Sequence, residues 1–201
     1  PNQFGRVSDD ARFNRATKGL YEMGSTFKVL NTAIALETGA ANINQKFEVA
    51  KPLRISRFTI TDYKPRARPL NVPEIMVYSS NIGSARIAEA IGAETQRAYM
   101  DKLGLLDRLP LQLPETSKPL SPKTWRRTTT ATVSYGHGIS ISMVHLASAI
   151  AAAAGTGHWI APTLIKPKTG EAPMAVRVFS DSTTRAVRSM MRLVVSHVDG
   201  S

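Results

Sequence analysis

The stretch Gly24-Ser25-Thr26-Phe27-Lys28-Val29-Leu30 decides how the rest of this sequence is interpreted. It opens a segment in which apolar residues recur at three- and four-residue spacing, and this pattern predicts a helix from Ser25 to Thr38 that stops at Gly39. Ser25 would lie at the helix N-terminus, where unpaired backbone N–H groups and the helix dipole favour developing negative charge. The segment therefore predicts both a central helix and a serine in a chemically favourable place.

Lys28 follows Ser25 by three residues, so both side chains would project from one face of the helix. A serine becomes a nucleophile when a neighbouring base takes its proton, and a lysine can be that base where burial or nearby cations lower its pKa. The pattern alone is weak, because serine is a common helix cap and lysine a common first-turn residue.

A second polar constellation is Tyr78-Ser79-Ser80-Asn81-Ile82-Gly83. It would form the turn between two predicted helices, Pro73 to Tyr78 and Ile82 to Ile91, with Asn81 as the cap of the second. In such a turn a hydroxyl can relay a proton, and an amide can orient the lysine and hold a substrate amide. The alternative is structural: the serines cap one helix end and Asn81 caps the next.

Composition limits the possible classes of protein. The 201 residues suit one domain or a large piece of one, and 42% are hydrophobic, enough to bury a core. No apolar run approaches the length of about eighteen residues that a transmembrane helix needs. The absence of cysteine excludes disulfides, thiolate metal sites and cysteine nucleophiles, and the four histidines show no metal-binding spacing. No metal site is expected.

The formal net charge of +11 calls for an explanation. Basic residues crowd into positions 54–68, where Asp62 is the only acid. Such a cluster can attract nucleic acid or anionic lipid, but blocks of like charge usually form a solvated face. No aromatic residues alternate with these arginines, and no zinc finger or helix-turn-helix accompanies them. We predict a solvated basic loop and no nucleic-acid partner.

Elsewhere the chain also favours helices over strands. Three more are predicted, at Ala93–Leu103, at Met143–Ala154 with Ser142 as its cap, and at Asp181–Ser196 after Ser180. Strand-like sequence is sparse: Phe58 to Thr61 alternates and is predicted to pair with residues near Phe47 to Val49. The chain is predicted to be mainly helical.

Taken together and in this order, the two polar motifs resemble the serine acyl-transferase set of penicillin-binding proteins and β-lactamases. Tyr21-Glu22-Met23-Gly24-Ser25-Thr26-Phe27-Lys28 resembles the family's Glu-Pro-Gly-Ser-Thr-x-Lys block, with Met23 in place of the usual proline. Ser79-Ser80-Asn81-Ile82-Gly83 resembles the class B Ser-Ser-Asn block, and Tyr135-Gly136-His137-Gly138-Ile139-Ser140 its Gly-x-Gly segment. The chain thus resembles a class B penicillin-binding protein transpeptidase domain, and overall similarity favours the division type.

The resemblance implies a peptidoglycan D,D-transpeptidase. Ser25 would attack the penultimate D-Ala of a stem peptide ending in D-Ala-D-Ala, and an amine of a neighbouring stem would then take the acyl group. β-Lactams would acylate the same serine, and the resemblance implies that no cofactor is needed. Lys28 would be its base, Ser79 would carry a proton to the leaving group, and the Ser25 backbone N–H would form half of the oxyanion hole.

The resemblance also assigns substrate contacts to Asn81, Ser80 and Gly138, with Asn81 touching Lys28 as well. It implies division or cell-wall synthesis proteins as partners of the full-length parent. The expected compartment is the bacterial periplasm, with the parent anchored to the inner membrane by an N-terminal helix outside this sequence.

The family's third motif, Lys-Ser/Thr-Gly on a sheet strand, is where the match departs. The triplet Lys168-Thr169-Gly170 lies between Pro167 and Pro173, a context that predicts a turn rather than a central strand. In the family the catalytic triplet follows a later helix, which here resembles Phe179 to Val195. We therefore interpret Lys168, Thr169 and Gly170 as a decoy and expect the true triplet beyond Ser201.

By the same comparison, the family's earlier strands would precede Pro1. The expectation is a single partial domain over 1–201: the helical part of the α/β fold shared with serine β-lactamases, its central sheet largely outside these residues. Such a chain would be catalytically impaired. The alternatives are a serine β-lactamase, for which Glu89, Glu94 and Glu115 offer no convincing deacylation loop, or a non-catalytic β-lactam sensor or helical interaction module.

Overall fold

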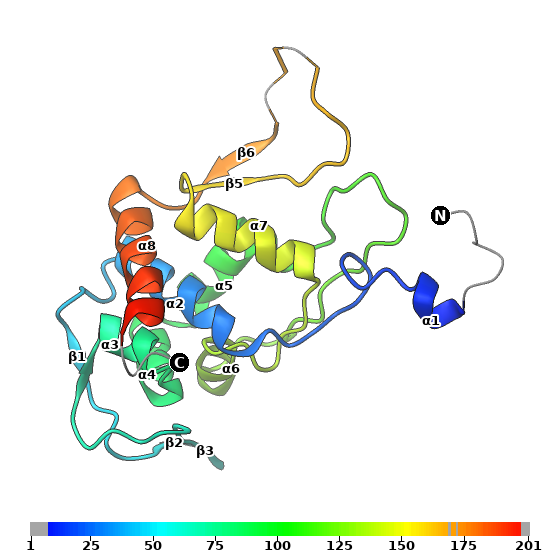
Figure 1. Cartoon of the computed structure of the whole chain (residues 1–201). Coiled ribbons are helices and arrows are strands. Elements are labelled where there is room, and N and C mark those ends of the chain that lie inside the picture. Colours follow the sequence, from blue (N-terminus) through cyan, green and yellow to red (C-terminus); the bar gives the residue numbers. More distant parts are fainter. Residues whose placement is uncertain (1–7, 169, 172, 198–201) are drawn as a thin grey trace.

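The computed structural model describes residues 8–168, 170, 171 and 173–197, and this part of the chain is mainly helical, as predicted (Figure 1). The helical elements are α1 (Asp9–Arg12), a 3-10 turn (Gly24–Thr26), α2 (Phe27–Glu37), α3 (Val72–Val77), α4 (Asn81–Ile91), α5 (Ala93–Lys102), α6 (Arg127–Val133), α7 (Met143–Ala154) and α8 (Asp181–Ser196). The strands are β1 (Lys46–Phe47), β2 (Leu53–Ile55), β3 (Phe58–Ile60), β4 (Leu70–Asn71), β5 (His158–Ile160) and β6 (Ala175–Arg177).

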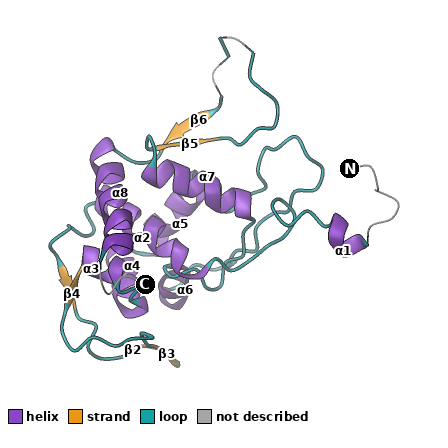
Figure 2. Ribbon diagram, in the orientation of Figure 1, coloured by secondary structure: helices purple, strands orange, loops and turns teal. Residues whose placement is uncertain are grey.

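Helix α2 forms the centre of the core and packs against α4, α7 and α8 (Figure 2). Its residues Phe27, Leu30 and Ile34 are fully buried at 0% exposure. Burying a side chain of this size contributes about 1.5–3 kcal/mol, so the apolar periodicity read from the sequence is what fixes α2 at the centre. The helix therefore holds its N-terminal residues, Ser25 and Lys28, on a rigid support.

The strands form three separate antiparallel pairs rather than one central sheet in the described residues. The predicted partner of Phe58–Thr61 is wrong. Leu53 pairs with Ile60 in a hairpin, whereas Phe47 pairs with Leu70. The hairpin turns at Ser56, which takes a left-handed φ of 55°, and this short connection makes the local pairing available.

Most helix ends fall where the caps predicted them. Ser142 and Ser180 accept hydrogen bonds from the first turns of α7 and α8. The assignment of Asn81 as the cap of α4 is wrong: Ser80 takes that position and accepts from the Gly83 N–H at 2.9 Å. Helix α6 was not predicted, because its threonine-rich sequence has low helix propensity and is held by tertiary packing.

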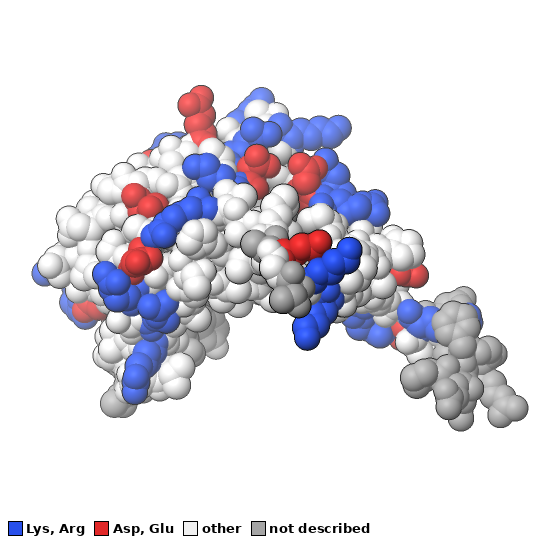
Figure 3. All heavy atoms as spheres, turned by 90° about the horizontal axis from the view of Figure 1, so that it is seen from above, with Lys and Arg blue, Asp and Glu red and all other residues white. Residues whose placement is uncertain are grey.

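The basic residues between 54 and 68 are mostly exposed, in agreement with the predicted solvated face. Arg66 is the exception, since its guanidinium stacks over the Tyr78 ring with 3.9 Å to the centroid. On the face seen in Figure 3, Lys and Arg are spread over several elements with Asp and Glu among them. Across the described residues, no helix combines the length and hydropathy that a bilayer crossing requires.

Candidate active site

The candidate nucleophile lies at the point where the chain enters α2. Gly24 takes a left-handed φ of 56° and starts the 3-10 turn that leads into the helix. Ser25 is exposed in this turn, whereas Lys28, in the first turn of α2, is 3% exposed. The sequence thus places an accessible hydroxyl beside a buried amine.

The Lys28 amine connects both candidate hydroxyls. It donates to Ser25 Oγ at 3.0 Å and to Ser79 Oγ at 2.9 Å, and its third bond goes to the Ser79 carbonyl at 2.5 Å. The two hydroxyls are also linked directly, with 3.1 Å between Ser79 Oγ and Ser25 Oγ. The Ser25–Lys28 hydrogen bond that helical spacing predicted is present, and Ser79 closes a triangle with it.

The environment of Lys28 destabilises its charged form relative to a lysine in water. Burial lowers the pKa of the Lys28 amine from 10.5 to about 8, while the negative charge of Asp62 opposes this and raises it. With a pKa near 8, about a tenth of the amine is neutral at pH 7, and this fraction can accept a proton. A general base is most effective when its pKa lies near the working pH.

Ser79 occupies an unusual backbone conformation, with a left-handed φ of 51° in a residue that carries a side chain. Such a conformation costs on the order of 1–3 kcal/mol and persists where its surroundings hold it. Lys28 binds the Ser79 carbonyl itself, and Asp62 holds the residues that follow, because its carboxylate accepts from the Ser80 hydroxyl at 2.6 Å and from the Ile82 N–H at 2.9 Å. Sequence reasoning missed this role, although Asp62 was visible as the single acid in the basic 54–68 region.

Two expected substrate contacts do not have the predicted surroundings. Ser80 is 1% exposed, and its hydroxyl is used by Asp62 and Gly83, so its position does not support a substrate contact. The Asn81 amide donates to the Thr61 carbonyl at 3.3 Å. The hydrogen bonds of Lys28 described above do not include Asn81, so no hydrogen bond joins these two residues. Helix capping explains the first difference, and anchoring of the β2–β3 segment explains the second.

The Gly136–Gly138 segment lies directly against the start of α2. A Cβ at Gly136 would come within 2.2 Å of the Gly24 carbonyl oxygen, and Gly136 has a φ of 79°, so only glycine fits. Gly138 donates its N–H to the Glu22 carboxylate at 2.7 Å. The three sequence blocks are therefore brought together, with the glycine segment beside the residue that precedes Ser25.

The Lys168 triplet lies elsewhere. Lys168 is exposed in the long loop between β5 and β6, which projects from the helical body (Figure 1). Gly170 is in a turn with a φ of 90°, and Thr169 lies outside the described residues. The predicted turn is confirmed for Lys168 and Gly170, and the described residues of this loop form no strand.

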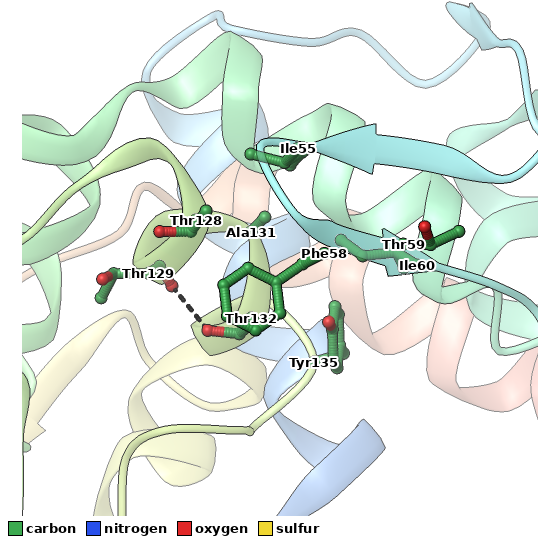
Figure 4. A pocket seen from close by; sticks show the side chains of 9 residues that line it. All are labelled: Ile55, Phe58, Thr59, Ile60, Thr128, Thr129, Ala131, Thr132 and Tyr135. Carbon is green, nitrogen blue, oxygen red and sulfur yellow. Dashed lines mark hydrogen bonds between the residues drawn. The ribbon is translucent and has the colours of Figure 1, made fainter.

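A cavity of about 250 Å³ separates the β2–β3 hairpin from α6 (Figure 4). The hairpin supplies an apolar wall with the Phe58 ring in front of Thr132, and α6 supplies several threonines. Tyr135 lines the cavity immediately before the glycine segment. Within the described part of the chain, no three His, Asp or Glu side chains cluster in a way that could hold a metal ion.

A serine at a helix start, bonded to a buried lysine and to a second serine, defines a serine acyl-transferase type of site. Residues 1–201 match the family model described as the penicillin binding protein transpeptidase domain, and the chain belongs to this family. It is 38% identical over 199 residues to the probable peptidoglycan D,D-transpeptidase FtsI of Caulobacter vibrioides, covering 99% of this chain and 34% of that protein.

Similarity to two further proteins supports the same family. The chain is 33% identical to the probable peptidoglycan D,D-transpeptidase PenA of Neisseria gonorrhoeae, covering 95% of this chain and 32% of that protein. It superposes with a TM-score of 0.87 on the apo transpeptidase domain of Burkholderia pseudomallei penicillin-binding protein 3, at 32% identity, covering 94% of this chain and 58% of that one. The chain thus spans about a third of the curated relatives and just over half of the solved domain.

Proposed function

We propose that the protein containing this chain is a peptidoglycan D,D-transpeptidase of the division type that β-lactams inhibit covalently. The observation that carries the proposal is the triangle of Ser25, Lys28 and Ser79, in which a buried amine bonds two hydroxyls. The relatives supply the reaction class, since they are named as probable peptidoglycan D,D-transpeptidases.

In the proposed acylation, neutral Lys28 takes the Ser25 proton as Ser25 Oγ bonds to the carbonyl carbon of the penultimate D-Ala. The peptide bond to the terminal D-Ala breaks, and the leaving amine receives its proton through Ser79, whose hydroxyl reaches both other members of the triangle. The Ser25 N–H stabilises the oxyanion at the helix start. An amine of a second stem then displaces Ser25 and forms the cross-link.

Asn81 and Gly138 are proposed to line the path of the stem peptide at the edge of this triangle. Asn81 is only partly buried, and Gly138 is exposed beside Glu22. The remaining half of the oxyanion hole and the Lys-Ser/Thr-Gly lysine are proposed to come from segments outside residues 1–201. The chain covers 58% of the solved relative, so that protein extends beyond the part matched here.

The test uses the full-length parent protein and fluorescent penicillin. We expect stoichiometric labelling that maps by mass spectrometry to the peptide containing Ser25 and disappears in Ser25→Ala. The isolated 201-residue chain should label about 10²–10³ more slowly, because losing one oxyanion donor has a cost of that size. Labelling on another residue, or none, would overturn the proposal.

Two further assays separate the alternatives. A cross-linking assay with stem peptides distinguishes a transpeptidase from an acylated sensor or an interaction module, neither of which forms product. Steady turnover of a chromogenic cephalosporin would instead favour a β-lactamase. We further propose a periplasmic location, an inner-membrane anchor in the parent and contacts with other division proteins, to be tested by fractionation and co-purification.

A further inference from the structure

A fully buried hydrogen-bond network lies behind the triangle and contains no group that the proposed reaction uses. Its centre is formed by two amides, Asn31 on α2 and Gln96 on α5, both 0% exposed. The Gln96 amide donates to the Asn31 side-chain oxygen Oδ1 at 3.4 Å and to the Thr130 backbone carbonyl at 3.1 Å, and it accepts from the indole N–H of Trp125 at 2.9 Å. Gln96 thereby uses both amide hydrogens and its carbonyl oxygen.

From Asn31 the network continues into α4 and the end of α6. Asn31 donates to the Ser84 carbonyl at 3.0 Å and to Ser84 Oγ at 3.2 Å. Ser84 Oγ in turn donates to the Ser134 carbonyl at 2.9 Å. Ser84 is 1% exposed and Ser134 is 0% exposed, so these bonds form away from water.

Each end of this network lies close in sequence to one of the three segments that build the site. Asn31 follows Lys28 by one helical turn on α2, and Ser84 lies in the first turn of α4, just after the Ser79 segment. Ser134 is two residues before Gly136, which packs on the Gly24 backbone. The network therefore connects the supports of the base, the second serine and the glycine segment.

Apolar side chains could have filled the same space with no loss of stability, since the net contribution of a buried hydrogen bond is modest. A satisfied polar network instead fixes one arrangement, because any shift leaves a buried donor unpaired. We propose that Asn31, Ser84 and Gln96 are positioning residues that set the spacing of the Ser25–Lys28–Ser79 triangle and the glycine segment. This role rests on the proposed transpeptidase function.

The test compares Ser84→Ala with Thr183→Ala in the full-length parent. Each variant removes one buried hydroxyl that bonds to another helix or its end, since Thr183 is 4% exposed and donates to Glu37 Oε2 at 2.6 Å. Thr183 is on α8 and contacts the C-terminal end of α2, opposite the end that carries Lys28. It therefore serves as the matched control. Thermal unfolding, the rate constant for penicillin acylation and its pH profile are measured for both.

We expect Ser84→Ala to lower the acylation rate constant roughly ten- to a hundred-fold and to move the midpoint of its pH profile, since small displacements of catalytic groups have effects of this size. Thr183→Ala should lose comparable thermal stability and leave the rate within about two-fold and the midpoint unchanged. Should Ser84→Ala fail to fold, Trp125→Phe removes the peripheral indole donor while keeping an aromatic ring, and a smaller change in rate and midpoint is expected.

Equal acylation rates and midpoints in Ser84→Ala, or in Trp125→Phe as its substitute, and in Thr183→Ala would overturn the positioning role while leaving the proposed function intact. If the wild-type parent is not acylated at Ser25, the proposed function fails, and the positioning role fails with it.

Discussion

The two ends of helix α2 hold ionisable groups in opposite ways. At the N-terminal end, burial lowers the pKa of Lys28 to about 8 and so disfavours its charged form. At the C-terminal end, burial raises the pKa of Glu37, but hydrogen bonds from Thr183 and Ser180 outweigh this effect, and its net pKa is lowered. Glu37 therefore stays charged and accepts from the Ser180 N–H, the Ser180 hydroxyl and Thr183.

The N-terminal end of α2, with Lys28, is the proposed reactive end, whereas the C-terminal end, with Glu37, has a structural role. The Glu37 carboxylate binds the capping residue Ser180 and the Thr183 hydroxyl and so ties α8 to α2, and every one of these bonds stabilises the ionised form. The Lys28 amine instead bonds two hydroxyls and a strained backbone segment while its charge is destabilised. Helix α2 is thus fixed at one end by a satisfied charge and holds a destabilised charge at the other, where the proposed proton transfer takes place.

The largest effect is expected from Lys28→Met in the parent protein. Loss of the base should lower the rate of penicillin acylation by about 10²–10⁴. Because the folded pKa of Lys28 is depressed, the unfolded state binds more protons between about pH 8 and 10.5, and the buried cation costs stability below that window. The variant should therefore be more stable at pH 7. Its free energy of unfolding should be higher by up to about 3 kcal/mol, and its unfolding temperature should rise accordingly.

If Lys28→Met kept a near wild-type acylation rate, Lys28 would not be the base, and the proposed difference between the two ends of α2 would be wrong. Lys28→Arg is the matched control, since it keeps a cation that cannot serve as a base at neutral pH. It should be equally slow in acylation but should not gain stability.

Asp62→Asn should change the electrostatic environment of Lys28 at the N-terminal end of α2. Asp62 raises the pKa of Lys28, so removing its charge lowers that pKa further and should move the midpoint of the acylation pH profile downward. The variant also loses one of the two bonds that Asp62 accepts from Ser80 and Ile82, so the maximal rate should fall. A midpoint that moves upward, measured by stopped-flow labelling from pH 5 to 10, would contradict the role of this charge.

Glu37→Gln should weaken the structural end and leave the chemistry alone. The expected loss at pH 7 is about 1–2 kcal/mol, discounted for the part of the carboxylate that is exposed. Because the folded pKa of Glu37 is lowered, this stabilisation is present above pH 4.5 and disappears as the pH falls through the lowered value. Thermal unfolding of both proteins should converge at low pH, whereas a constant difference would argue against the charge.

The smallest effect is expected at Lys168, far along the β5–β6 loop from either end of α2. Its ammonium is exposed, so Lys168→Ala should change the acylation rate by less than about two-fold and stability by less than about 0.5 kcal/mol. A severe acylation defect would place the third motif in this loop after all.

Features that depend on local sequence patterns could be predicted from the sequence. Helical periodicity and serine caps located α2, α7 and α8, and the spacing of Ser25 and Lys28 predicted their hydrogen bond. What it could not predict depends on contacts between distant segments. Asp62 reaches Ser80 only because the β2–β3 hairpin returns the chain to α4, and Asn81 is drawn to Thr61 by the same contact. The threonine-rich helix α6 is likewise stabilised by tertiary packing, which no local sequence pattern predicts.

The pH dependence of Ser25 acylation in the full-length parent tests the central claim most directly. If burial keeps Lys28 poised as a base, the rate constant should rise with pH through a midpoint at about 8 or below, since any further cation in the complete site lowers the pKa again. A midpoint near 10.5, the ordinary value for lysine, would show that the buried end of α2 does not destabilise the charge and would contradict the account.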